Sequence, residues 1–115
     1  YTTDSLYNIS ALSFGALSAR AIKALSDGAA KAGCWLNTGE GGVSEYHLAS
    51  GADIVFQIGT AKYGVRDEHG QLCDKLLAAL AAKAQIKMFE IKMSLERAAY
   101  CRVKRSLKKL QKYAV

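Results

Sequence analysis

The stretch Asn37-Thr38-Gly39-Glu40-Gly41-Gly42 places three glycines and one carboxylate within six residues. Glycine has no Cβ, so these positions let the backbone turn sharply or approach a ligand closely. The preceding residues 34–36 are apolar and predict the end of a short buried strand. A strand that leads into a polar glycine loop is how α/β proteins build a site at the carboxyl ends of their strands. We therefore expect a site at this loop, with residues up to about 94 as its support.

One strand and one helix are predicted before this loop. Residues 7–11 form a short β-prone run that ends in a turn at residues 13–16. In the helix that follows, Ser18 is a suitable N-cap and Gly33 a suitable C-terminal glycine. Apolar residues at helical spacing predict one buried face, made by Ala21, Ile22, Leu25 and Ala29.

After the loop the pattern continues as strand, helix and strand. Residues 53–58 are almost continuously apolar, which suits a sheet buried on both faces, and they end in a second glycine loop at residues 59–64. A helix is predicted over about residues 72–84 and a strand over residues 86–92. The buried side of that helix is expected to be Leu76, Leu77 and Leu80.

Strands that alternate with helices predict parallel pairing through right-handed crossovers. Four strands that each end in a polar loop indicate an α/β fold, a partial (β/α)8 TIM barrel comprising about its first four strands. The strand ends carry Ser13, Thr38, Gln57 and Lys92. Because the carboxyl ends of barrel strands meet at one rim, we expect these four side chains to converge on one cavity.

The composition indicates one small domain followed by a basic tail. The chain has 115 residues, half of them apolar, and does not begin with Met, which is expected of a piece of a longer protein. Residues 1–94 carry nine Lys/Arg and nine Asp/Glu, whereas residues 95–115 carry seven Lys/Arg against Glu96 alone. The whole net charge of +6 therefore lies in the tail. We predict a domain over residues 1–94 and a basic amphipathic helix over residues 95–115.

Membrane, disulfide and metal-binding classes are disfavoured. No apolar run approaches the roughly 20 residues that a membrane span requires. Cys34, Cys73 and Cys101 are odd in number and far apart, so we interpret them as unreactive thiols in a reducing cytoplasm. His47 and His69 are predicted to lie in loops, and neither is expected to bind a metal.

Four motifs stand in order along the chain, at residues 9–18, 37–42, 57–60 and 90–92. Together they resemble the FMN-binding barrel domain of glutamate synthase and glutamate-synthase-like proteins. The resemblance implies an oxidoreductase that forms glutamate from 2-oxoglutarate and ammonia through FMN, as part of ammonia assimilation. Electrons would come from an NAD(P)H-linked subunit or from ferredoxin.

The resemblance also implies roles for five residues. Ser13, Thr38 and Gln57 would lie against the flavin ring and hydrogen-bond its edge. Lys92 would place a positive charge near the flavin or the substrate carboxylates, where it stabilises a reduced flavin anion. Glu40 would orient the substrate or organise its own loop.

Structural explanations for the same residues remain open. Ser13 could help to cap the following helix, and Thr38 could be a turn residue. Gln57 could be a hydrogen bonder at a strand end without a ligand, and Lys92 could pair with a structural carboxylate. Glu90 is expected to point the other way, because neighbouring strand residues face opposite sides.

The resemblance ends after Ser94, where the family continues with a glycine-rich segment similar to QGAKPGKGG. One back-translation of residues 95–115, read from its third base, gives GKGGILPGEKVTEEIAEIRG, which is similar to that continuation. We therefore hypothesise a frameshift after Ser94 and an off-frame tail, which sequencing of the encoding DNA would test.

A fragment of this kind is expected to be inactive alone. The loops after strands 7 and 8, which usually bind phosphate in such barrels, are missing, as is a three-cysteine cluster for iron and sulfur. Open barrel edges predict self-association. The alternative is a non-enzymatic module whose basic tail binds nucleic acid, anionic lipid or an acidic partner.

Overall fold

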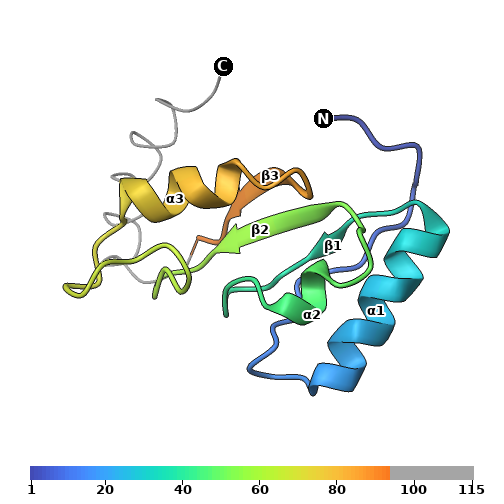
Figure 1. Ribbon diagram of the computed structural model, residues 1–115, viewed down its shortest axis with the longest axis horizontal. Coiled ribbons are helices and arrows are strands. Elements are labelled where there is room, and N and C mark those ends of the chain that lie inside the picture. The colour runs from blue at the N-terminus through green and yellow to red at the C-terminus, as the bar shows by residue number, and fades with distance from the viewer. Residues whose placement is uncertain (94–115) are drawn as a thin grey trace.

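The computed structural model describes residues 1–93, which form three helices and three strands. The predicted domain boundary, the tail helix at residues 95–115 and Cys101 lie outside the described residues. Within residues 1–93, no helix has the length and apolar character needed to cross a membrane. The elements in chain order are α1 (Ala19–Ala32), β1 (Leu36–Asn37), α2 (Glu45–Leu48), β2 (Ile54–Ile58), α3 (Asp74–Ala81) and β3 (Ile86–Ile91) (Figure 1).

The three strands form one parallel sheet in the order β1-β2-β3. The predicted strand over residues 7–11 is wrong, because only a single parallel bridge joins Ile9 to Leu36. The backbone N–H of Trp35 donates to the Oδ1 of the Asn8 side chain at 3.2 Å, and not to a backbone carbonyl as it would in a regular strand pair. This segment therefore runs beside β1 in parallel without becoming a strand.

The predicted ends of the first helix are confirmed. The Ser18 hydroxyl accepts the N–H of Ala21 at 3.3 Å, and Gly33 closes α1 in the left-handed conformation with φ of +64°. A residue with a Cβ is disfavoured at that φ, which explains the glycine. Ile22 and Ala29 of the predicted face are buried.

The strand β2 is buried at all five residues, as its apolar sequence predicts. The helix α3 is shorter than expected, and only part of its predicted buried side is confirmed. Leu77 and Leu80 are buried, whereas Leu76 is 42% exposed. With only eight residues, α3 meets the sheet over a narrow face, and Leu76 lies at its margin.

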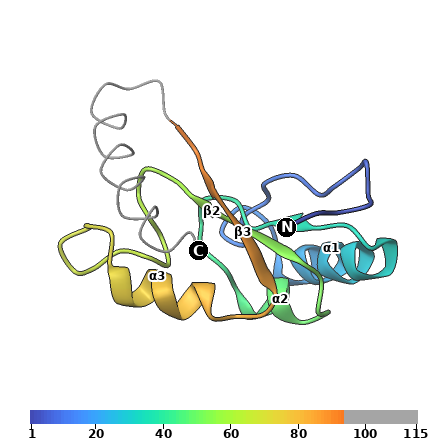
Figure 2. The same cartoon turned by 90° about the horizontal axis from the view of Figure 1, so that it is seen from above.

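All three helices lie on one side of the sheet (Figure 2). Alternate residues of β2, Ile54, Phe56 and Ile58, join the core beneath those helices. Phe56 packs edge to face against Phe89 of β3, with ring centroids 5.8 Å apart. Because side chains alternate along a strand, Gln57 points to the opposite face of the sheet. The structure thus separates an apolar helix-covered face from a face that carries polar side chains near the strand ends.

Candidate functional site

Three segments meet closely at the carboxyl end of the sheet. A Cβ at Gly39 would lie only 2.8 Å from the backbone nitrogen of Ser13, and Gly39 also has φ of +64°. A Cβ at Gly59, just after β2, would lie 2.5 Å from the side chain of Glu40. Both glycines are therefore required by the close approach of neighbouring chain segments.

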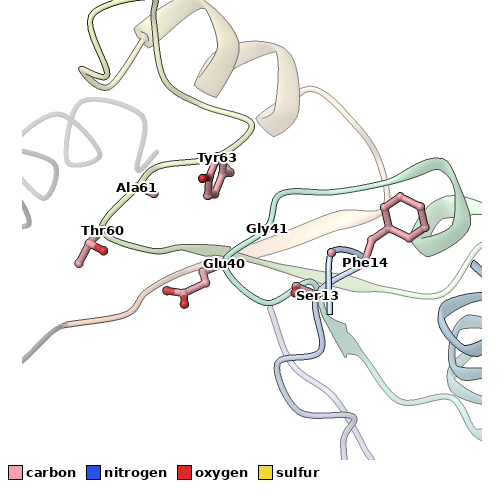
Figure 3. Close-up of a pocket in the computed structure, with 8 residues that line it drawn as sticks. Ser13, Phe14, Glu40, Gly41, Thr60, Ala61 and Tyr63 are labelled. Carbon is pink, nitrogen blue, oxygen red and sulfur yellow. The ribbon is translucent and has the colours of Figure 1, made fainter. Parts of the chain in front are cut away.

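An open pocket of about 490 Å³ lies at this meeting point (Figure 3). Its polar groups are the Glu40 carboxylate and the hydroxyls of Ser13, Thr60 and Tyr63. Within residues 1–93, none of the three hydroxyls has a hydrogen-bond partner, so all are available to a ligand. The residues that line the pocket are Ser13, Phe14, Gly15, Glu40, Gly41, Thr60, Ala61 and Tyr63.

An ion pair joins the glycine loop to the end of β3. Lys92 Nζ lies 3.3 Å from Glu40 Oε1, and the two side chains are 54% and 49% exposed. The backbone N–H of Lys92 donates to the carbonyl of Ile58 at 3.0 Å, which fixes the lysine beside β2. The structural alternative for Lys92, pairing with a carboxylate, is thus observed. A half-exposed pair of this kind is worth less than about 1 kcal/mol, so Lys92 can exchange partners easily.

Gln57 lies in β2 and Thr38 follows β1 directly, and neither lines the pocket. Thr38 is fully buried, and its hydroxyl accepts the N–H of Gln57 at 3.1 Å and donates to the carbonyl of Gly39 at 2.9 Å. It therefore ties the end of β1 to β2. Of the four predicted residues, Ser13 lines the pocket and Lys92 reaches its wall through Glu40. Contact of Thr38 and Gln57 with a flavin stays a prediction.

The expected orientation of Glu90 is wrong. Its carboxylate lies on the same side of β3 as the site and accepts hydrogen bonds from Gln57 Nε2 and, at 2.8 Å, from Asn37 Nδ2. Glu90 and Lys92 are two residues apart, and residues at that spacing on a strand share a face. The alternation of side chains along a strand would therefore have predicted that Glu90 faces the same side as Lys92.

His47 is also placed differently from the prediction, in helix α2 rather than in a loop. The ring is fully buried, and burial lowers its pKa, against the opposing effect of the hydrogen bond to Leu12. Nδ1 accepts the N–H of Ser44 at 3.1 Å, which assigns the hydrogen to Nε2, 3.3 Å from the carbonyl of Leu12. A neutral histidine thus connects α2 to the segment that carries Ser13.

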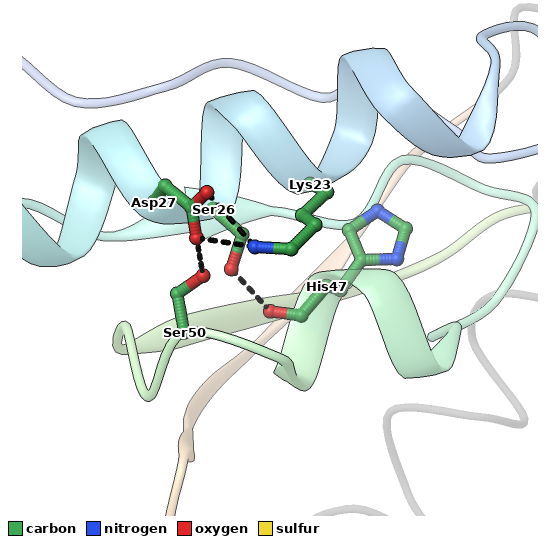
Figure 4. A network of polar contacts seen from close by, with 5 residues as sticks. All are labelled: Lys23, Ser26, Asp27, His47 and Ser50. Carbon is green, nitrogen blue, oxygen red and sulfur yellow. Dashed lines mark hydrogen bonds and ion pairs between the residues drawn. The ribbon is translucent and has the colours of Figure 1, made fainter.

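Helix α1 supports this region through a second polar network (Figure 4). The buried hydroxyl of Ser26 donates to the carbonyl of His47 at 2.8 Å. Asp27 accepts the hydroxyl of Ser50 and pairs with Lys23 at 2.9 Å. The Ser50 hydrogen bond, followed by Lys23, lowers the pKa of the Asp27 carboxyl. These contacts hold α2 and the turn after it against α1.

The chain has parallel strands in chain order with polar glycine loops at their carboxyl ends. This is the α/β arrangement in which ligands usually bind at that edge of the sheet. Residues 2–96 match the family described as "Conserved region in glutamate synthase", and the chain belongs to this family. The predicted resemblance is therefore confirmed at the level of the family.

One similar protein is the glutamate synthase large subunit-like protein YerD of Bacillus subtilis (strain 168), at 49% identity over 95 residues. The aligned region covers 82% of this chain but only 18% of that protein. No solved structure gives a significant match.

Proposed function

We propose that residues 1–93 are the first part of an FMN-binding (β/α)8 domain, and that the complete protein forms glutamate by reductive amination of 2-oxoglutarate. The observation that carries the proposal is the meeting of residues 12–13, the glycine loop and the ends of β2 and β3 around one pocket. Strands in chain order with a site at their carboxyl ends are typical of this barrel.

The side chains that line the pocket support a flavin ring as its ligand. Phe14 and Tyr63 supply aromatic surface, and the hydroxyls of Ser13 and Thr60 can hydrogen-bond a polar ring edge. Bound FMN would supply the electrons that reduce an imine, while the protein orients it and tunes its electronics. Loops after strands 7 and 8 usually bind the phosphate, so this chain alone should bind the ring weakly and catalyse nothing.

The ion pair at the pocket wall suggests how the chain's own residues act on a dianionic substrate. Lys92 is half exposed and its ammonium group is paired with the equally exposed Glu40, so it can turn toward a carboxylate. Glu40 would then hold the loop or orient the substrate. The chain covers only a small part of its relative, so the NAD(P)H-linked or ferredoxin electron donor and the ammonia source would bind elsewhere in the whole protein. A cytoplasmic location and self-association of the isolated chain belong to the same proposal.

A chimera tests this function. Residues 2–93 would replace the matching stretch of the Bacillus subtilis relative, and FMN content and glutamate formation would be measured. In the chimera, Lys92→Met should raise KM for 2-oxoglutarate roughly tenfold, because one charge-assisted contact is lost. Lys87→Met, in the strand β3 that precedes Lys92 and paired with Asp53 at 3.8 Å, serves as the matched control and should leave KM unchanged. A folded chimera that purifies without flavin would refute the proposal.

A further inference from the structure

Three polar side chains cross the sheet from β1 to β3 near its carboxyl end. Glu90 of β3 accepts hydrogen bonds from Asn37 of β1 at 2.8 Å and from Gln57 of β2. Asn37 and Gln57 are only 2% and 5% exposed. One carboxylate therefore restrains two almost buried amides, each on a different strand.

The chemistry of these contacts fixes which end of each amide faces the carboxylate. An ionised carboxylate only accepts hydrogen bonds, so Asn37 Nδ2 and Gln57 Nε2 must both point at Glu90. The carbonyl oxygen of Asn37 then accepts the N–H of Gly39 at 2.9 Å, which connects Glu90 to the glycine loop.

The carbonyl oxygen of Gln57 has a different environment. Among the described residues none donates a hydrogen bond to Oε1. The same oxygen is not one of the fully buried side-chain atoms in residues 1–93 that lack a partner, so a small part of its surface is accessible. Position 57 thus presents an acceptor oxygen at the end of β2.

Gln57 does not line the pocket itself. We propose that the ligand site extends from the pocket to the end of β2, and that Glu90 is a positioning residue there. In this arrangement Glu90 makes Gln57 present a carbonyl oxygen that selects a ligand group carrying an N–H. The imide of a flavin ring is such a group, and in this respect the inference rests on the proposed function. Glu90 itself touches no ligand in this arrangement and acts through the Gln57 amide. Its second contact, to Asn37, holds the glycine loop in register with the same amide.

The first test follows the amides directly in the 115-residue chain. In Glu90→Gln an NH2 group replaces one of the two accepting oxygens, so one of the two side-chain amides must either be released or turn its oxygen toward position 90. In both cases the N–H groups of that amide lose their acceptor. By NMR, the side-chain N–H signals of Asn37 or Gln57 should lose their protection from hydrogen exchange. Glu68→Gln, which alters a highly exposed carboxylate, is the matched control and should leave both signals unchanged. Protected signals for both amides in a folded Glu90→Gln chain would overturn the proposed contacts.

The second test compares two probes, riboflavin and 3-methylriboflavin, which lacks the imide N–H. The wild-type chain should bind riboflavin roughly tenfold more tightly, the value of one hydrogen bond to a site built for it. Glu90→Gln should remove this preference, and Glu68→Gln should keep it. The double variant Gln57→Glu/Glu90→Gln should restore it, because a carboxylate at position 57 accepts both the amide of position 90 and the ligand N–H.

The outcomes separate this inference from the proposed function. A folded wild-type chain that binds neither probe would overturn the flavin assignment together with the N–H selection, while the NMR result still decides whether Glu90 holds the amides. Binding of both probes with equal affinity overturns the selection alone. The positioning role of Glu90 is overturned if Glu90→Gln keeps the full preference for riboflavin over 3-methylriboflavin, or if the double variant does not regain it.

Discussion

Replacing Gly39 with alanine tests the close approach on which the pocket depends. At φ of +64° a residue with a Cβ costs about 1–2 kcal/mol. The new Cβ would also lie 2.8 Å from the backbone nitrogen of Ser13 and 3.2 Å from the carbonyl carbon of Leu12. Backbone atoms cannot rotate away, so the segment must shift, and overpacking of this kind costs about 1–3 kcal/mol. Gly39→Ala should therefore lower the free energy of unfolding by about 2–5 kcal/mol.

Gly33 provides a matched control, because it has the same φ of +64° and a Cβ at this position would meet no atom within 4 Å. Gly33→Ala should cost only the conformational part, about 1–2 kcal/mol. Urea unfolding followed by circular dichroism measures both variants. If Gly39→Ala does not fold, the comparison is repeated in a Gly28→Ala background, which should gain about 0.5–1 kcal/mol within α1. Equal losses for the two variants would refute the contact between residues 12–13 and the glycine loop.

Three further predictions concern the parts that support the site. Burial lowers the pKa of His47 below its ordinary 6.5, so the unfolded chain binds a proton first as the pH falls. The free energy of unfolding should therefore be highest above about pH 6.5 and decline as the pH falls below it. His47→Gln should remove this decline in urea titrations across that range. Ser18→Ala should lower the free energy of unfolding by about 1 kcal/mol in the same assay, because it removes the N-cap of α1; an unchanged value would contradict the cap. Leu77→Ala should lower the free energy of unfolding by about 2–5 kcal/mol, whereas Leu76→Ala, at an exposed position, should lower it by less than about 1 kcal/mol. Similar losses for the two variants would contradict the observed buried face of α3.

The elements that could be predicted from the sequence are those with local signals. Ser18 and Gly33 mark the ends of α1 because a cap hydrogen bond and a left-handed turn each depend on one residue type. The strand β2 is buried on both faces, so an unbroken apolar run was sufficient to find it. The partial barrel stays a prediction, since three parallel strands and one bridged segment occur equally in open α/β sheets.

The elements that could not be predicted depend on tertiary contacts. The helix α2 has four residues, too few for any helical period to show, and is held by Ser44 and the buried His47. The failure of residues 7–11 to form a strand comes from the Asn8 side chain, which replaces a backbone partner. At the site, Ser13 and Glu40 could be selected from their loops, but Thr60 and Tyr63 were not singled out, because only the folded second loop brings them to the pocket.

The order of the strands has a consequence for how the chain acquires its structure during synthesis. Each new strand pairs with the one made just before it, so every pairing closes a loop of only roughly 20–30 residues. Closures of this length between consecutive strands favour stepwise assembly that proceeds from the amino terminus as the polypeptide leaves the ribosome. The sheet can thus grow by one strand at a time, and its outermost strand always offers the template on which the next is added.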